Sequence, residues 1–274
     1  MKEAEVRGET GVLGEIGATD GTRGPRAYGG AASRNFRTTA MQLLVGTSGF
    51  SYKEWLGQFY PEKHPAAEML SYYARHFQTV EINNTFYRMP AESMLEGWCQ
   101  QVPENFEFTL KAPRRITHDK RLREIDADVS EFARRSGLLG SRLGVLLFQL
   151  PPNLKKDLQR LLNLMNLVPK DKRFAMEFRH DSWQDEEVYA ALRAGGAMLC
   201  VTDTDEGDTP YVATSDYGYI RLRRTHYEDG DLRGWVERIA AQGLPRTYVY
   251  FMHEDEALGT KFGQRLLELW KAAT

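Results

Sequence analysis

Only two cysteines, Cys99 and Cys200, occur among the 274 residues of the chain. There is no Cys-x-x-Cys pair and no cluster of cysteine with histidine, which argues against a zinc-finger type of metal site. No apolar run approaches about 18 residues, so no segment is predicted to cross a membrane. No charged-then-apolar signal segment is found either, and we therefore expect a cytoplasmic protein without a membrane partner.

An excess of charge is also lacking. The chain has 36 Lys and Arg residues against 38 Asp and Glu residues, which gives a formal net charge of −2. No long-range field would therefore recruit nucleic acid or an anionic membrane surface. The first predicted strand is not followed by a dinucleotide-binding glycine motif or by a P-loop, so these nucleotide sites have no support.

Residues 1–40 contain few large apolar side chains but eight of the 24 glycines. Such a segment cannot bury enough apolar surface to offset the entropy lost on ordering. We predict a flexible N-terminal extension over residues 1–40 and a folded domain over residues 41–274. Met41, directly before the first predicted strand, is an alternative translation start.

From Gln42 onward, strand-like runs alternate with helical patterns. The predicted strands are Leu43–Thr47, Thr79–Asn83, Phe106–Ala112, Leu143–Leu150, Arg173–Phe178, Ala197–Thr202, Tyr217–Leu222 and Thr247–Phe251. The predicted helices are Ala66–Phe77, Ala91–Gln101, Ala127–Gly137, Lys155–Leu167, Gln184–Ala194, Asp231–Gln242 and Leu258–Ala272. The alternation predicts an α/β fold, and eight strands predict a single closed (β/α)8 TIM-type barrel. An open doubly wound sheet is the alternative.

Polar side chains recur near the carboxyl end of every predicted strand. They are Thr47, Ser48, Glu81, Asn83, Lys111, Gln149, Glu177, Arg179, Asp203, Arg221, Arg223 and His253. Barrel enzymes place their active sites at this end of the strands. Because buried charge is costly unless it is paired, a converging set predicts a pocket, an internal ion-pair network that closes the barrel, or both.

Seven short motifs in the chain are similar to those of the YecE-like family, the domain of unknown function 72. They are G-T-S-G-F-S-Y (Gly46–Tyr52), Y-Y-A-R-H-F (Tyr72–Phe77), V-E-I-N-N-T-F-Y-R (Val80–Arg88), K-A-P-R-R-I-T-H (Lys111–His118), F-Q-L-P-P (Phe148–Pro152), E-F-R-H-D-S-W (Glu177–Trp183) and Y-V-Y-F (Tyr248–Phe251). The resemblance implies a TIM-type barrel of bacterial cytoplasmic origin and supplies no activity. The family usually has two asparagines after the last strand, where this chain has Met252 and His253, so His253 is a candidate substitute.

A hydrolase is the predicted function, with Glu81 and Glu177 as an acid and base pair. Its substrate would be small and polar or anionic, either phosphate-bearing or derived from nucleic acid. The predicted catalytic residues are Glu81, Glu177, Lys111 and Asp203. The predicted substrate-binding residues are Thr47, Ser48, Asn83, Tyr87, Gln149, Arg179, Trp183, Arg221 and His253. A sugar-active enzyme is an alternative, in which Trp55, Tyr87 and Trp183 would stack on the sugar.

Three further alternatives remain open. A nucleic-acid-binding barrel would use the basic run Arg114–Arg123, with Arg114, Arg115 and His118 meeting phosphates at the mouth. A divalent metal would be held by Glu81, Glu177, Asp203 and His253, although the nearby cations oppose it and we predict no cofactor. Lys111 could also act as a Schiff-base amine. The oligomeric state is left open.

Overall fold

The computed structural model describes residues 41–253 and 255–273, so the predicted extension at residues 1–40 lies outside the described part. The strands are β1 (Gln42–Thr47), β2 (Thr79–Ile82), β3 (Glu107–Lys111), β4 (Leu143–Gln149), β5 (Arg173–Glu177), β6 (Met198–Leu199), β7 (Val201–Thr204), β8 (Gly207–Asp208), β9 (Tyr217–Leu222) and β10 (Arg246–Phe251). They form two five-stranded sheets, in the orders β1-β10-β9-β7-β8 and β2-β3-β4-β5-β6. Among the strand pairs of the described ranges, only β7–β8 is antiparallel.

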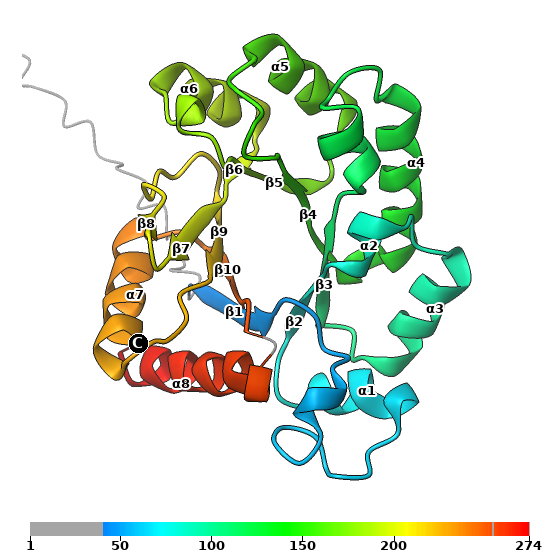
Figure 1. Cartoon of the computed structure of the whole chain (residues 1–274), viewed down its shortest axis with the longest axis vertical. Helices are drawn as coiled ribbons and strands as arrows, with labels where there is room; N and C mark the ends of the chain where they lie inside the picture. Colours follow the sequence, from blue (N-terminus) through cyan, green and yellow to red (C-terminus); the bar gives the residue numbers. More distant parts are fainter. Residues whose placement is uncertain (1–40, 254, 274) are drawn as a thin grey trace, which may run out of the picture. The chain divides into compact units, whose positions relative to one another are not determined.

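Helices follow most of the strands and lie outside them (Figure 1). They are α1 (Met69–Tyr73), α2 (Asn84–Tyr87), α3 (Glu92–Gln101), α4 (Asp126–Ser136), α5 (Leu158–Leu167), α6 (Glu186–Gly195), α7 (Asp229–Gln242) and α8 (Leu258–Ala273). Capping residues explain several ends: the side chain of Asp157 accepts from the Arg160 amide at the start of α5, and α7 stops at Gly243, whose φ is 62°. No helix in the described ranges is long and apolar enough to span a bilayer.

The two sheets adjoin at two places. Cys200 alone separates β6, which pairs with β5, from β7, which pairs with β9. At the other junction, an isolated bridge joins Ser48 to Glu81, and the Gly49 amide donates to the Glu81 carbonyl at 2.7 Å. A side chain at Gly46 would place its Cβ 2.1 Å from the Thr79 carbonyl oxygen, so glycine permits this close approach of β1 to β2.

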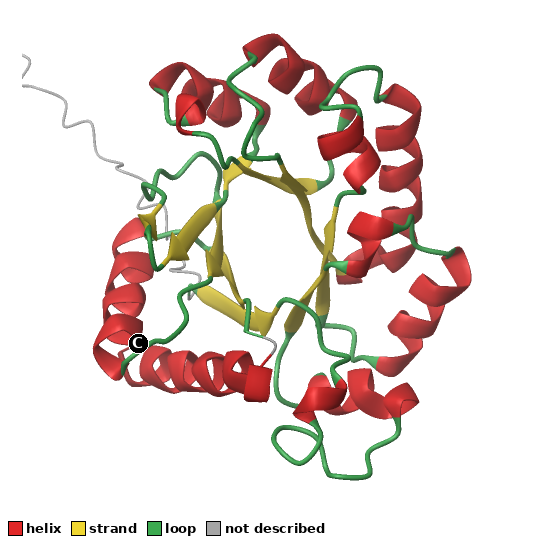
Figure 2. Ribbon diagram, in the orientation of Figure 1, coloured by secondary structure: helices red, strands yellow, loops and turns green. Residues whose placement is uncertain are grey.

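The strands surround a common centre, with the helices on the outside (Figure 2). The prediction of an α/β fold with parallel strands is therefore confirmed. The hydrogen-bonded pairing of the strands, however, forms two sheets. It does not form the single closed barrel that was predicted from eight strands in the sequence. The predicted sixth strand is interrupted at Cys200, and its second part continues to Thr204 before turning into β8.

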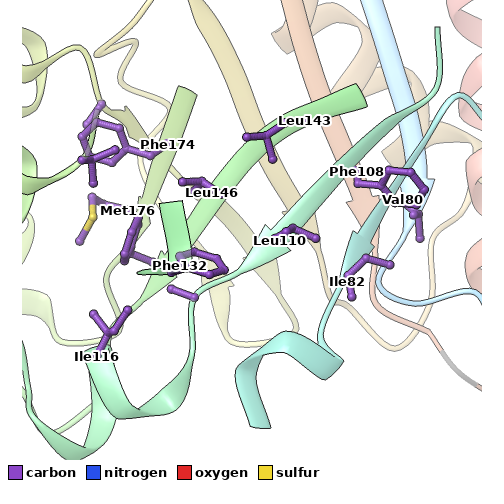
Figure 3. Packing of buried hydrophobic residues seen from close by; sticks show 14 of the residues in the cluster. Val80, Ile82, Phe108, Leu110, Ile116, Phe132, Leu143, Leu146, Phe174 and Met176 are labelled. Atoms are coloured by element: carbon purple, nitrogen blue, oxygen red, sulfur yellow. The ribbon is translucent and has the colours of Figure 1, made fainter. Parts of the chain in front are cut away.

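Side chains of each strand point alternately toward the helices and toward the centre, which gives an outer core and an inner core. Figure 3 shows part of the outer core, in which Ile82, Leu110 and Leu146 lie on the side of the sheet that packs against the helices. The inner core is smaller and includes Tyr219 and Tyr250. The hydroxyl of Tyr250 lies 2.7 Å from that of Thr79 and 2.8 Å from that of Thr109. These tyrosines fill the centre below the predicted site.

Candidate functional site

Arg221 of β9 stands at the centre of the candidate site and is completely buried. Its Nη2 lies 2.8 Å from Glu81 Oε1, and its Nη1 forms an ion pair with Glu177 Oε2. Nη1 also donates to Gln149 Oε1 at 3.3 Å. One guanidinium therefore joins carboxylates from β2 and β5, and the planar fork of arginine suits this two-sided pairing.

Glu81 is completely buried and accepts hydrogen bonds from three side chains. Ser48 Oγ donates to Oε1 at 2.7 Å, where Arg221 also donates, and the Tyr219 hydroxyl donates to Oε2. Asn83 Nδ2 donates in turn to Ser48 Oγ. These contacts hold the carboxylate in one orientation and occupy both of its oxygens.

Glu177 is held in its ionised form by three arginines. Burial by itself would raise its pKa, but Arg221, Arg179 and Arg223 outweigh that effect and lower the pKa to about 2. Arg179 Nε lies 3.0 Å and Arg223 Nη1 3.6 Å from Glu177 Oε1. Glu177 is therefore ionised across the neutral range and cannot supply a proton there.

Lys111 occupies the end of β3 and lies over the ring of Phe86, with Nζ 4.3 Å from the ring centroid. Burial lowers its pKa, the Arg221 charge lowers it further, and Glu81 and Glu177 offset part of the shift, which leaves a pKa of about 8. His118 packs edge-on against the same ring at 4.9 Å. Its pKa is lowered by burial and then by the Lys111 charge. Two titratable groups whose pKa values are both lowered by burial thus meet at Phe86.

A cavity of about 660 Å³ opens beside Glu177, and Arg179, Arg223 and Thr202 are among the residues that line it. The β7–β8 hairpin also lines it through residues 204–208. The lining carries two guanidinium groups, Arg179 and Arg223, and five carboxylates, Glu177, Asp181, Asp205, Glu206 and Asp208. The two arginines beside Glu177 are the part of the lining that suits an anionic group.

The model of the family described as "Protein of unknown function DUF72" matches residues 44–274. The chain belongs to this family. UPF0759 protein YecE of Escherichia coli K12 is 30% identical over 168 residues, which span 59% of each chain. UPF0759 protein YunF of Bacillus subtilis 168 is 26% identical over 84% of this chain and 82% of its own length.

A solved DUF72 structure from Thermotoga maritima MSB8 has a TM-score of 0.75 at 29% identity and covers 84% of this chain and 99% of its own. A second, from Enterococcus faecalis V583, has a TM-score of 0.71 at 17% identity, over 84% of this chain and 96% of its own. At 17% identity, the similarity to the Enterococcus faecalis structure shows a shared fold alone. Membership of the DUF72 family confirms the resemblance carried by the seven motifs.

In this DUF72 chain, the structure corrects the predicted position of Asp203. The register of β7 with β9 sets Thr202 opposite Arg221 and Asp203 opposite Leu222. Paired residues of parallel strands share a face, so Thr202 faces the mouth and Asp203 faces the helices. Asp203 is completely buried there and accepts from Arg224 Nε at 2.8 Å and from Trp235 Nε1 at 3.0 Å.

Thr47 and His253 also lie away from the predicted pocket. Thr47 pairs with the outward Phe251, and its hydroxyl lies 3.0 Å from that of Tyr73 in α1. The His253 ring contacts the Arg224 carbonyl through Nε2 and packs edge-on against Phe262 at 5.2 Å. Both side chains therefore support the outer packing layer.

The predicted aromatic platforms are mostly structural. Trp183 is 1% exposed, donates its indole hydrogen to the Leu154 carbonyl at 2.7 Å and stacks on Phe178 at 4.6 Å. Trp55 is completely buried. Tyr87, at the end of α2, is 75% exposed and remains accessible to a ligand. Stacking on a sugar by Trp55 or Trp183 is thus excluded by their burial.

The basic run after β3 contains a π-helical turn over Arg115–Asp119. Arg114 pairs with Asp119 at 3.1 Å, and Arg115 pairs with Asp128 at 2.7 Å. Both arginines are exposed on the surface, whereas His118 lies beside Phe86 at the mouth. A nucleic-acid partner for Arg114 and Arg115 stays a prediction.

The alternative set of metal ligands is not assembled. Glu81 and Glu177 are bonded to Arg221, while Asp203 and His253 lie on the outer side. Within the described part of the chain, no group of three or more His, Cys, Asp or Glu side chains is arranged to hold a metal ion.

Sequence reasoning assigned no catalytic or binding role to four residues of the site: Phe86, Tyr219, Thr202 and Arg223. Arg223 was already in the polar set at the strand ends, and Tyr219 lies two residues before Arg221, a spacing equal to the strand period that could have identified it. Phe86 and Thr202 are different, because only the packing of α2 on β3 and the register of β7 bring them to the mouth.

Proposed function

We propose that this chain binds a small phosphate-bearing molecule at the carboxyl ends of its strands and hydrolyses it. The observation that carries the proposal is the pair of arginines, Arg179 and Arg223, that lines the cavity beside Glu177. Arg179 and Arg223 both contact the same Glu177 oxygen, line the cavity and retain partly exposed guanidinium groups. Arginine forks match the oxygens of a phosphate group.

Acid–base chemistry is assigned to Lys111 in this proposal. With a pKa of about 8 it exists in both protonation states near neutrality, which suits a general acid or base. In its neutral form, the amine can take a proton from a water that attacks phosphorus, while Arg179 and Arg223 stabilise the charge on the phosphate oxygens. His118 packs on the same Phe86 ring, and burial and the Lys111 charge lower the pKa of its imidazole.

A glycoside hydrolase receives less support from the same geometry. That chemistry needs one protonated carboxyl group as the acid. Glu177 stays ionised because its pKa is lowered to about 2, and Glu81 already accepts from three donors. The two carboxylates are better suited to fixing Arg221.

As part of this proposal, we infer that the two sheets act as the halves of one closed (β/α)8 barrel. The two junctions between the sheets are the Ser48–Glu81 bridge and the one-residue break at Cys200. Both junctions adjoin strands that carry site residues. Closure of the barrel would therefore hold Glu81 and Glu177 at a constant separation on either side of Arg221.

Replacing Arg223 with leucine is expected to weaken the binding of inorganic phosphate about tenfold or more. The physical reason is the loss of a charge-assisted hydrogen bond, which contributes roughly 1.5–3 kcal/mol. Isothermal titration calorimetry at low ionic strength measures this change. Arg193→Leu is the matched control, because Arg193 pairs with Glu186 on the surface of α6. Equal affinities for the Arg223→Leu variant and the unaltered chain would rule out the arginine clamp.

Hydrolysis is tested with p-nitrophenyl phosphate and bis(p-nitrophenyl) phosphate. We expect turnover of at least one of them to rise as Lys111 loses its proton near pH 8, and to be lost in Lys111→Met. Phosphate binding without turnover of either ester would instead indicate a non-catalytic binding barrel.

A further inference from the structure

The amino group of Lys111 has an unusual environment for a lysine of this chain. Other lysines, such as Lys156 and Lys172, pair with carboxylates at 3.0 Å and 2.7 Å. Among the residues that the structure describes, Lys111 Nζ has neither an ion pair nor a hydrogen bond, and its close contact is the Phe86 ring. Lys111 therefore presents a partly buried amine that is not ion-paired with a neighbouring carboxylate.

The position of this amine is nevertheless well defined. Lys111 pairs with Leu147 of β4, and its carbonyl accepts from Thr85 Oγ1 at 2.7 Å. Its side chain therefore leaves β3 on the inner face, where Leu147 belongs to the inner core. The cationic groups of Arg179, Arg221 and Arg223 lie around the same mouth. An electrophile with an anionic group would be held there close to Nζ.

From this arrangement we propose that Lys111 forms an imine with the carbonyl carbon of a small aldehyde or ketone that carries a phosphate group. This second activity goes beyond the proposed hydrolysis, because no phosphate ester bond is broken. It shares with that function only the two arginines of the cavity lining, Arg179 and Arg223, which would hold the phosphate.

The step is a condensation between the neutral amine and the carbonyl group. The nitrogen lone pair attacks the carbonyl carbon and forms a C–N bond. The carbonyl oxygen then takes the two amine hydrogens and leaves as water, which gives the C=N bond of the imine. No oxidant, reductant or metal is needed for this step.

Five groups around Nζ determine its charge. They are Glu81 on β2, Glu177 at the end of β5, Arg179 in the segment after β5, Arg221 on β9 and His118 in the turn after β3. The arginines and burial together outweigh the two carboxylates, so the pKa is about 8. An exposed lysine has a pKa of about 10.4, so Lys111 supplies far more neutral amine at pH 8 than the surface lysines do.

Reductive trapping tests the inference. The unaltered chain is incubated with glyceraldehyde 3-phosphate and sodium borohydride, which reduces an imine to a stable secondary amine. Intact mass spectrometry is expected to show one adduct per chain, and peptide mapping is expected to locate it at Lys111. The extent of labelling should rise with a midpoint near pH 8, and inorganic phosphate should slow it.

Two matched variants test whether the adduct forms at Lys111. Lys111→Arg keeps the positive charge and should remove the adduct, whereas Lys172→Arg should retain it because Lys172 is paired with Asp171. Labelling spread evenly over surface lysines, labelling that persists in Lys111→Arg, or no adduct at all would each overturn the inference. Mapping on the unaltered chain makes the outcome independent of whether a variant folds.

The two proposals can fail separately. If inorganic phosphate binds and p-nitrophenyl phosphate is hydrolysed but no adduct forms, imine formation alone is wrong. If Lys111 is labelled selectively while neither ester is hydrolysed, the proposed hydrolysis alone is wrong.

Discussion

Replacing Arg221 with methionine is expected to lower the free energy of unfolding by about 3–5 kcal/mol at pH 7. Arg221 is completely buried between Glu81 and Glu177, which are buried as well. Removing one partner of a buried ion pair leaves uncompensated charge in a medium of low polarity, and here two carboxylates would lose their shared cation. Urea denaturation followed by tryptophan fluorescence measures the change.

The effect of Arg221→Met should depend on pH in a defined direction. The pKa of folded Glu177 is about 2, below the value of about 4.3 expected in the unfolded chain. Its ionised form therefore stabilises the fold above the unfolded pKa, and this contribution is lost as the pH falls toward 2. Protonation also relieves the charge on the carboxylates that have lost Arg221 in the variant. The difference in stability should consequently shrink between about pH 5 and pH 2.

Arg193→Met is the matched control for this experiment. Arg193 is 43% exposed in its pair with Glu186, and such surface pairs contribute about 0–1 kcal/mol. A loss of stability in Arg221→Met no larger than that of the control would show that the buried bridge does not support the fold. Arg221 would then be free for a ligand.

Trp183→Ala is expected to lower the free energy of unfolding by about 3–5 kcal/mol, as is typical when a large aromatic side chain is removed from a core. Trp183 is buried between Phe178 and the Leu154 carbonyl, so the change removes both a ring stack and a hydrogen bond. Thermal and urea unfolding measure the loss.

Tyr87→Ala provides the comparison, since Tyr87 is 75% exposed and its truncation should change stability by no more than about 0.5 kcal/mol. A stable Trp183→Ala protein with weakened phosphate binding would contradict the structural role and restore Trp183 as a ligand-binding residue. The pair of variants therefore separates packing from recognition among the aromatic residues near the site.

Several site residues could be predicted because strand periodicity is local. Glu81 lies between Val80 and Ile82, and Gln149 follows Phe148, so their side chains must point away from the outer core. Arg221 follows from the same reasoning with Ile220 and Leu222 as neighbours. Charges at such positions also predict mutual pairing, because isolated buried charge is too costly. The bridge between Arg221 and Glu81 joins residues 140 positions apart in the chain.

Other positions depended on the register between strands, which is not a local property. Asp203 follows the break at Cys200, and only the pairing of Thr202 with Arg221 shows that Asp203 turns toward Trp235. The large aromatic ring of Trp183 is typical of a ligand-stacking residue. Its indole N–H, however, donates to a backbone carbonyl in the segment after β4, which is distant in the sequence. Local patterns cannot specify partners that are distant in sequence.

The sequence by itself determined the family, the alternation of strands and helices and the inward polar set Glu81, Lys111, Gln149, Glu177 and Arg221, because motifs and periodicity depend on neighbouring residues. Only the tertiary structure decided which charges are paired. It assigns Glu81 and Glu177 to Arg221, turns Asp203 and His253 outward, and leaves Lys111 with a ring as its close contact. The physical reason is that burial and distance, which set the charge of each group, arise only when separate strands are brought together.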